Sequence, residues 1–104
     1  MSRRVGQDGR TNCRTKQFRE LFSRLPETIQ QAALDAFEQF LLNPMHPSLR
    51  PHELKDGGRG KHQVASRSVS ITNSYRAIYV VDGTVNVWYW IGSHSDYNTI
   101  TGRK

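Results

Sequence analysis

The strongest pattern of hydrophobic and polar positions lies in residues 75–97, near the end of the chain. Two runs rich in β-branched and aromatic side chains flank Asp82-Gly83, which is a strong signal for a tight β-hairpin. Glycine supplies the positive φ that such a turn needs. A two-residue turn at this pair predicts that the strands align Val81 with Thr84, Ile78 with Val87 and Arg76 with Tyr89.

Alternation along the hairpin predicts two different faces. One face is aliphatic and is expected to pack against helices; it carries Ile78, Val80, Val85, Val87 and Ile91. The other carries the aromatic side chains of Tyr75, Tyr79, Trp88 and Trp90. The two tryptophans either stack on RNA bases or are buried under helices or at a protein interface. Arg76 opens the first strand and His94 follows the second, so both are expected at one end of the hairpin.

Two amphipathic helices are predicted before the hairpin. The first spans about Thr15 to Arg24, with Thr15 as its N-cap and an apolar i, i+3, i+4, i+7 stripe of Phe18, Leu21, Phe22 and Leu25. Pro26 suits the first turn of the second helix, which is expected to end near Asn43 because Pro44 follows. Its inward stripe is Ile29, Ala32, Ala33, Ala36, Phe37, Phe40 and Leu41.

The remaining segments complete an α+β fold. Residues 1–14 are interpreted as a flexible basic tail ending in a short edge strand near 11–14, and residues 43–62 as a long loop held to the core by Leu49 and Leu54. A strand follows at about 63–72, with Val69 and Ile71 on one face and Ser68, Ser70 and Thr72 on the other. The predicted fold is therefore a helical hairpin packed on one face of a small antiparallel sheet, as a single domain over 15–104.

Length and composition favour one cytoplasmic domain. The chain has 104 residues, which is enough for one modest core. No apolar run approaches the ~20 residues needed to span a bilayer, and no apolar stretch follows the N-terminal arginines as in a secretory signal. Cys13 is the single cysteine, so no intramolecular disulfide is possible. The histidines His46, His52 and His62 lack the spacing typical of zinc sites, so neither a metal nor a cofactor is expected.

The charge is uneven along the chain. Fifteen Lys and Arg against nine Asp and Glu give a formal net charge of +6, and residues 26–43 hold three acidic and no basic side chains. The basic regions on either side of that segment indicate a surface for nucleic acid or for an acidic protein partner. The alternative is a solvated basic surface with no partner.

The motifs together resemble those of the RelE/ParE superfamily of toxins from type II toxin–antitoxin systems. The resemblance spans about residues 15–98 and rests on the order of elements and on a few short motifs. These are a Leu-Pro joint between the helices, Asn43-Pro44-Met45-His46-Pro47-Ser48-Leu49-Arg50, Leu54-Lys55-Asp56, Tyr75-Arg76-Ala77-Ile78-Tyr79, and Trp90-Ile91-Gly92-Ser93-His94-Ser95-Asp96-Tyr97. The resemblance implies a small basic toxin that an acidic antitoxin wraps and neutralises.

The ribonuclease branch of this superfamily enters the ribosomal A site and cuts messenger RNA without a metal. By resemblance, Arg76 would hold the scissile phosphate, His94 would serve acid/base chemistry, and Tyr97 would orient or stack. Lys55 and Lys61 match basic residues of the central loop, and with Arg67 they would bind RNA phosphates. Most of these residues also have a structural alternative. Arg76 could be a strand-end arginine paired with Asp96 or stacked on Tyr89, and His94 could be a loop histidine that caps a strand end. Tyr97 could simply pack, and Lys55 and Lys61 could be solvated loop charges.

Metal-free RNA cleavage explains why these residue types suit the reaction. It needs a base for the 2′-hydroxyl, positive charge near the phosphorane and an acid for the leaving oxygen. Histidine is the usual proton carrier near neutral pH, and the arginine fork matches a phosphate. The RNA supplies the nucleophile, so no catalytic Ser, Cys or metal is required.

Two other functions stay open at the level of sequence. ParE-like members poison DNA gyrase by binding and cleave no RNA. A catalytically silent homologue that still binds an antitoxin is the other alternative. Many members carry a basic residue where this chain has Ser70, and Arg67 lies on the opposite face of that strand.

Overall fold

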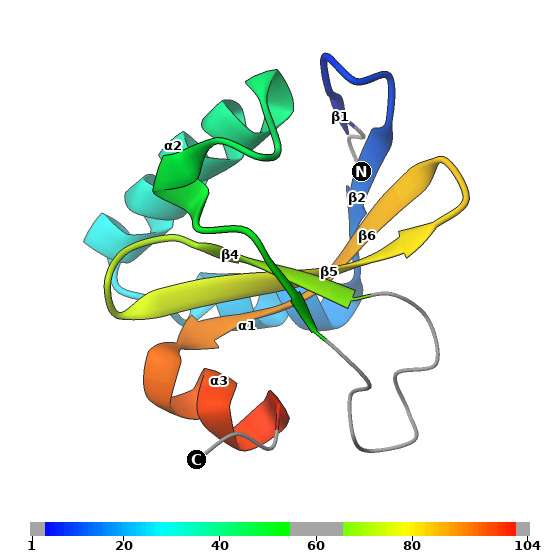
Figure 1. The fold of residues 1–104 in the computed structure, drawn as a ribbon. Helices are drawn as coiled ribbons and strands as arrows, with labels where there is room; N and C mark the ends of the chain where they lie inside the picture. Colours follow the sequence, from blue (N-terminus) through cyan, green and yellow to red (C-terminus); the bar gives the residue numbers. More distant parts are fainter. Residues whose placement is uncertain (1–3, 55–65, 102–104) are drawn as a thin grey trace.

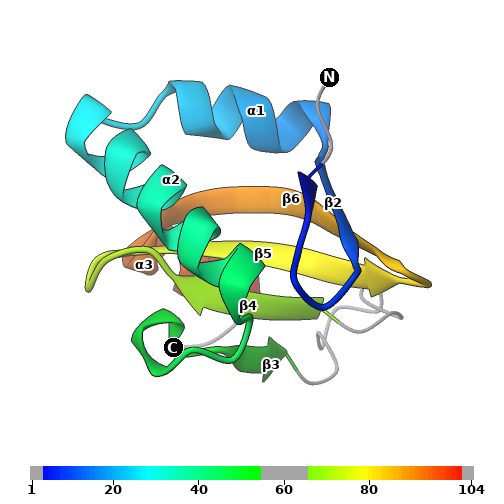
Figure 2. The same ribbon diagram turned by 90° about the horizontal axis from the view of Figure 1, so that it is seen from above.

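A computed structural model describes residues 4–54 and 66–101, which form one six-stranded sheet with helices on both sides (Figure 1, Figure 2). The strand order is β1-β2-β6-β5-β4-β3, and every neighbouring pair is antiparallel except β2 with β6. The strands are β1 (Arg4–Val5), β2 (Thr11–Arg14), β3 (His52–Leu54), β4 (Ser66–Ser70), β5 (Tyr75–Asp82) and β6 (Val85–Ser93).

Helices cover both faces of the sheet. They are α1 (Lys16–Ser23), α2 (Glu27–Leu42), the short 3-10 helix η1 (Pro47–Leu49) and α3 (His94–Thr101). In Figure 1, α2 lies above the sheet and α3 below it, and Figure 2 shows α1 and α2 crossing the same face. The predicted α+β class and the helical hairpin on one face are therefore confirmed, and α3 is an additional helix on the other face.

The two predicted helices begin and end close to their expected limits. The side chain of Thr15 accepts a hydrogen bond from the backbone N–H of Phe18 at 3.1 Å, which confirms it as the N-cap of α1. Helix α2 starts one residue after Pro26 and ends at Leu42. Asn43 then adopts an extended backbone, with φ −158° and ψ 100°, as expected for a residue that precedes a proline.

The hairpin forms where it was predicted, but in another register. Asp82 pairs with Val85, so Gly83 and Thr84 are the turn residues, and Gly83 has a φ of +60°. The predicted pairing of Val81 with Thr84 is wrong, because Val81 pairs with Asn86. The physical reason is that glycine supplies the positive φ at the first turn position, which leaves Asp82 as the last residue of β5.

A β-bulge shifts the register further along the hairpin. Tyr79 pairs with Trp88 whereas Ile78 pairs with Trp90, so Tyr89 is an extra residue on β6. The side chains of Trp88 and Trp90 consequently pack in two different clusters. The predicted division into an aliphatic and an aromatic face is therefore wrong. Ala77, Tyr79, Trp88 and Ile91 pack toward α1 and α2, Ile78 and Trp90 pack with Tyr97 of α3, and Val80, Val85 and Val87 are only half-buried.

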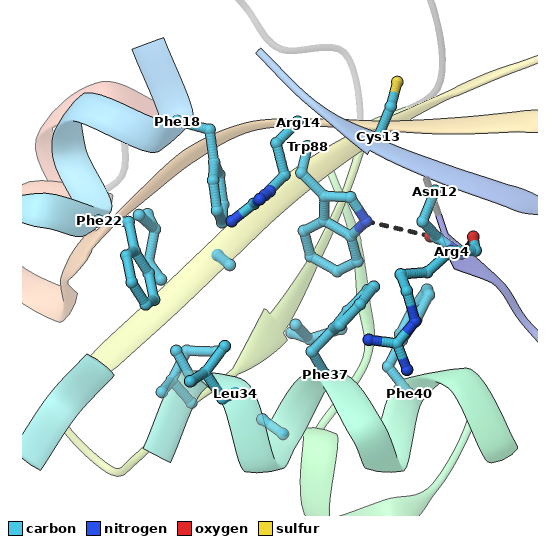
Figure 3. A pocket seen from close by; sticks show the side chains of 16 residues that line it. Arg4, Asn12, Cys13, Arg14, Phe18, Phe22, Leu34, Phe37, Phe40 and Trp88 are labelled. Atoms are coloured by element: carbon cyan, nitrogen blue, oxygen red, sulfur yellow. Dashed lines mark hydrogen bonds between the residues drawn. The ribbon is translucent and has the colours of Figure 1, made fainter. Parts of the chain in front are cut away.

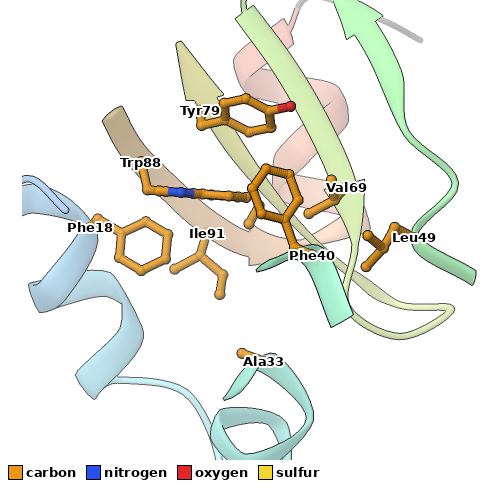
Figure 4. Packing of buried hydrophobic residues seen from close by; sticks show 9 residues of the cluster. Phe18, Ala33, Phe40, Leu49, Val69, Tyr79, Trp88 and Ile91 are labelled. Atoms are coloured by element: carbon orange, nitrogen blue, oxygen red, sulfur yellow. The ribbon is translucent and has the colours of Figure 1, made fainter. Parts of the chain in front are cut away.

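The main core lies between the sheet and the helical hairpin (Figure 4), and Trp88 is at its centre. Its ring centroid lies 4.5 Å from that of Tyr79, 5.0 Å from Phe40, 6.1 Å from Phe37 and 6.3 Å from Phe18. Such aromatic pairs add stability beyond the burial of their area. Burial under the helices is thus the outcome for Trp88, rather than a surface that stacks bases.

The segment expected to be a flexible tail contains two strands. The strand near residues 11–14 is confirmed as β2, but it is not an edge strand, because β1 pairs with its outer side. Buried Asn12 fixes β2 to β6: its Oδ1 accepts hydrogen bonds from Trp88 Nε1 at 3.1 Å and from Asn86 Nδ2 at 3.0 Å. The parallel pairing depends on contacts distant in sequence, so local patterns did not predict it.

Helix α3 was also absent from the predicted elements. Ser93 precedes it, and the Ser93 side chain accepts a hydrogen bond from the backbone N–H of Asp96 at 3.1 Å. The spacing Ser93-x-x-Asp96 is that of a helix N-terminus, so the sequence did contain a signal for this helix.

The long connection after α2 carries η1 and β3. Leu49 is buried in the main core and Leu54 packs against the second cluster, which confirms that both fix this connection. Lys55 and Lys61 lie outside the described residues. In the described part of the chain, no helix has the length and apolarity needed to cross a membrane.

Candidate functional site

A polar groove lies where the end of the β5–β6 hairpin meets α3 and the segment before β3. Its volume is about 540 Å³, and it is lined by Arg50, Pro51, His52, Arg76, His94, Tyr97 and Asn98. Arg76 pairs with Gly92, close to the point where β6 passes into α3. The structure thus brings Arg76, His94 and Tyr97 together, as expected for one end of the hairpin.

The guanidinium of Arg76 is held from three directions. Its Nη2 donates hydrogen bonds to Ser68 Oγ at 2.9 Å and to the backbone oxygen of Arg50 at 3.1 Å. Its central carbon lies 5.1 Å from the centre of the Tyr97 ring, within the range of a cation–π contact. Arg76 is half-buried, so these contacts fix its position and leave part of it facing the groove.

Tyr97 and His94 form the α3 side of the groove. Tyr97 is 3 % exposed, and its hydroxyl lies 3.1 Å from Ser68 Oγ. The His94 ring stacks on the Tyr97 ring with centroids 5.8 Å apart and an angle of 22° between their planes. His94 is the first residue of α3 and is exposed, so its imidazole can reach a bound substrate.

Ser68 connects these residues and was not among the predicted site residues. It is fully buried in β4, and its single hydroxyl contacts both Arg76 and Tyr97. An arginine side chain can only donate, so the serine oxygen accepts from Arg76. The sequence placed Ser68 on the polar face of its strand but carried no signal that this face adjoins Arg76.

Two basic residues of the groove also went unrecognised in the sequence. Arg50 has φ 45° and ψ 56°, a left-handed backbone conformation that costs a non-glycine residue roughly 1–2 kcal/mol. This conformation ends η1 and turns the Arg50 carbonyl toward Arg76. His52 lies on β3, opposite Ser68 of β4, with its side chain exposed at the groove. Both belong to a proline-rich connection that local patterns describe only as a loop.

Of the predicted phosphate-binding residues, Arg67 is the one that the structure describes, and it does not line this groove. Arg67 lies on the opposite side of β4 from Ser68, hydrogen-bonded to Tyr79 of the main core. Lys55 and Lys61 fall outside the described residues, so their predicted role stays a prediction. Ser70 is buried and donates its hydroxyl proton to the backbone oxygen of Thr72 at 2.8 Å.

The groove has the chemistry of an anion site with proton carriers. Among the described residues, its lining holds two guanidinium groups and two imidazoles, and no carboxylate side chain. Arginine forks bind phosphates, and imidazoles can donate and accept protons. Across residues 4–54 and 66–101, no three His, Cys, Asp or Glu side chains gather in a way that would hold a metal ion.

Solved structures share this fold, although no family model matches the sequence and no curated protein sequence is similar to it. YafQ from E. coli strain BL21(DE3) has a TM-score of 0.63 at 14% identity, over 85% of this chain and 97% of that chain. The E. coli DinJ-YafQ toxin–antitoxin complex gives 0.61 at 14% identity, over 84% and 94%. A copper-bound mutant toxin from Helicobacter pylori gives 0.54 at 20% identity, over 82% and 94%.

These matches cover nearly the whole of each toxin chain and most of this one. At identities of 14–20% they establish the fold. The chain therefore has the RelE-like toxin fold, as its resemblance to the RelE/ParE superfamily predicted.

Proposed function

We propose that this protein is the toxin of a type II toxin–antitoxin system and a metal-independent endoribonuclease that cuts messenger RNA on the ribosome. The observation that carries the proposal is the groove in which Arg76 is fixed beside His94 and Tyr97. The toxin fold and the resemblance of the Tyr-Arg strand and the Ile-Gly-x-His-x-x-Tyr motif support the same conclusion.

In the proposed reaction, the ribose 2′-oxygen attacks the adjacent phosphorus and the bond to the 5′-oxygen breaks. One imidazole takes the proton of the 2′-hydroxyl, and a protonated imidazole gives a proton to the leaving 5′-oxygen. His94 fills one of these roles and His52, on the other side of the groove, fills the second. Arg76 binds the phosphate and stabilises the charge that develops on it, while Tyr97 orients His94 and Arg76.

The proposed partners follow from charge. Messenger RNA and the ribosome present phosphates, and the net charge of +6 favours association with them. Lys55, Lys61 and Arg67 are proposed to add positive charge and contacts to RNA phosphates. The same charge suits an acidic antitoxin that covers the protein and blocks the groove. These partners imply a cytoplasmic location.

The first test is primer extension on a defined messenger RNA in a cell-free translation reaction. The purified protein is compared with Arg76→Ala, His94→Ala and the matched control Arg24→Ala, an exposed arginine at the end of α1. We expect cuts that require translation, a loss of about 10²-fold or more in the first two variants, and full activity in the control.

Other outcomes would point to the alternative functions. An intact message under a strong growth arrest would favour inhibition of DNA gyrase. An intact message without arrest would favour a silent antitoxin-binding protein. Full activity of a folded Arg76→Ala or His94→Ala variant would show that the site is assigned to the wrong residues.

A further inference from the structure

A second hollow lies on the opposite face of the sheet, between α1, α2 and β2 (Figure 3). Its volume is about 160 Å³, and most of its lining is apolar, including the aromatic side chains of Phe18, Phe22, Phe37, Phe40 and Trp88. Helix α2 contributes the small side chains of Ala33 and Ala36, which leave the space unfilled. An apolar cavity of about 150 Å³ holds one benzene-sized molecule. The hollow therefore has room for a single ring.

Two arginines, Arg4 and Arg14, line this apolar hollow, and only Arg4 forms an ion pair within the described residues. Arg4 forms an ion pair with Glu38 at 3.1 Å and lies over the Phe37 ring, 5.8 Å from its centre. Arg14, the last residue of β2, lines the hollow and is exposed. Figure 3 shows its side chain extending toward Phe18. Within residues 4–54 and 66–101, the structure gives Arg14 no carboxylate partner.

We propose that this hollow is a binding site for a small carboxylic acid with a single aromatic ring or a branched apolar body. The apolar body enters between Phe18, Phe37 and Trp88, and the carboxylate meets the guanidinium of Arg14. Aromatic walls favour the ring by edge and stacking contacts, and the arginine fork matches a carboxylate. The site is on the other side of the sheet from the basic groove, so the inference is independent of the proposed nuclease activity.

Charge makes the acid preferable to a neutral molecule of the same shape. A neutral ring would gain only the apolar contacts, whereas an acid also pairs with Arg14. An ion pair at an exposed side chain is worth up to about a fivefold change in affinity. A phosphate or a nucleotide is a poor occupant, because the polar lining among the described residues is limited to the two arginines, Asn12 and Cys13. The Oδ1 of Asn12 already accepts hydrogen bonds from Trp88 and Asn86.

The two tryptophans give an internal control for the test. Trp88 lines the hollow, whereas Trp90 packs with Ile78 and Tyr97 on the other face of the sheet. The uniformly ¹⁵N-labelled protein is titrated with phenylacetate, phenylacetamide and acetate while both indole N–H signals are followed. We expect a saturable shift of the Trp88 signal with phenylacetate, no shift of the Trp90 signal, about fivefold weaker binding of the amide, and no binding of acetate.

Three variants separate the contributions of charge and space. Arg14→Gln is expected to reduce phenylacetate binding to the level of the amide and to leave amide binding unchanged. Lys16→Gln, which removes an exposed positive charge from the start of α1, is the matched control and should bind like the unmodified protein. Ala36→Leu fills the space and should abolish binding of both rings.

Several outcomes would overturn the inference. If no probe shifts the Trp88 signal saturably, the hollow is not a ligand site. Equal affinity for acid and amide, or no effect of Arg14→Gln, would reduce it to an apolar cavity without preference for an acid. A shift of Trp88 by a purified acidic partner protein, with no binding of the small acids, would make the hollow part of a protein interface instead.

Discussion

The buried hydroxyl of Ser68 is the smallest feature on which the groove depends. It has no solvent access, and it joins the phosphate-binding candidate Arg76 to the hydroxyl of Tyr97. Water cannot replace a hydrogen bond at such a position without a cavity to enter. Removal of the Ser68 hydroxyl therefore affects the orientation of both Arg76 and Tyr97.

Replacing Ser68 with alanine should lower both stability and cleavage. The Tyr97 hydroxyl would be left buried without this partner, which costs about 1–3 kcal/mol of unfolding free energy. Arg76 would lose its hydrogen bond to Ser68 and keep the one to the Arg50 carbonyl, so cleavage should fall by about tenfold. Tyr97→Phe is the comparison, because it keeps the ring beneath Arg76 and the Arg76–Ser68 bond. Urea denaturation and single-turnover cleavage measure the two effects. Equal cleavage by Ser68→Ala and the unmodified protein would contradict the positioning role.

The sequence predicted some of the residues that line the groove and missed others. Arg76 and His94 were expected together because they lie at one end of a hairpin that local signals specify, and Tyr97 was added by the resemblance to the RelE/ParE superfamily. Arg50, His52 and Ser68 were missed because a left-handed residue at Arg50 and the pairing of β3 with β4 bring them there. Neither feature has a local sequence pattern.

The periodicity of hydrophobic residues predicted the two helices better than it predicted the hairpin. The apolar stripes of α1 and α2 predicted their limits closely, since each helix buries one face over several turns. The hairpin was predicted in the wrong register because its turn lies at Gly83-Thr84 and not at Asp82-Gly83. Its faces were predicted wrongly because one extra residue at Tyr89 inverts the alternation from there onward. Trp88 and Ile91, three positions apart, consequently share a face.

Strand β2 shows how a polar side chain holds a short element in place. Asn12→Ala should cost about 2–4 kcal/mol of unfolding free energy, because Trp88 Nε1 and the Asn86 amide would both lose a buried acceptor. Thermal or urea denaturation measures the loss. Cys13→Ala, at the neighbouring half-buried position, should change stability by far less. Comparable losses in the two variants would mean that the strand pairing, and not the asparagine, carries the stability.

The whole molecule has a sheet with two different sides. One side carries the main core and the apolar hollow, and the other carries the second cluster and the basic groove. The sequence predicted the α+β class and one helix layer, but not the second layer, because α3 is short and only its capping signal marks it. The sheet lies between the groove and the main core, so residues of the groove can change without repacking the centre of the protein.

Two tyrosines, one on each side of the sheet, link the stability of the whole fold to alkaline pH. Burial in the main core raises the pKa of Tyr79, partly offset by a hydrogen bond from Arg67. Burial likewise raises the pKa of Tyr89, partly offset by its bond with Ser66. The folded protein thus retains the phenol protons more tightly than the unfolded chain, in which tyrosine ionises near about pH 10.

The stabilising effect of both tyrosines is complete below about pH 10 and should be lost as the pH rises through their folded pKa values. Urea midpoints measured at several values between about pH 9 and 11.5, together with tyrosinate absorbance, follow this loss. In Tyr79→Phe and in Tyr89→Phe one ionisation is missing, so the midpoint should fall less steeply with pH than in the unmodified protein. Val87→Ala, at a half-buried position of β6, removes packing but no titratable group, so it is the control and should keep the original slope. Identical slopes in all four proteins would show that lysine deprotonation, which they share, governs the alkaline loss of stability, and that the two sides of the sheet do not retain their phenol protons on folding.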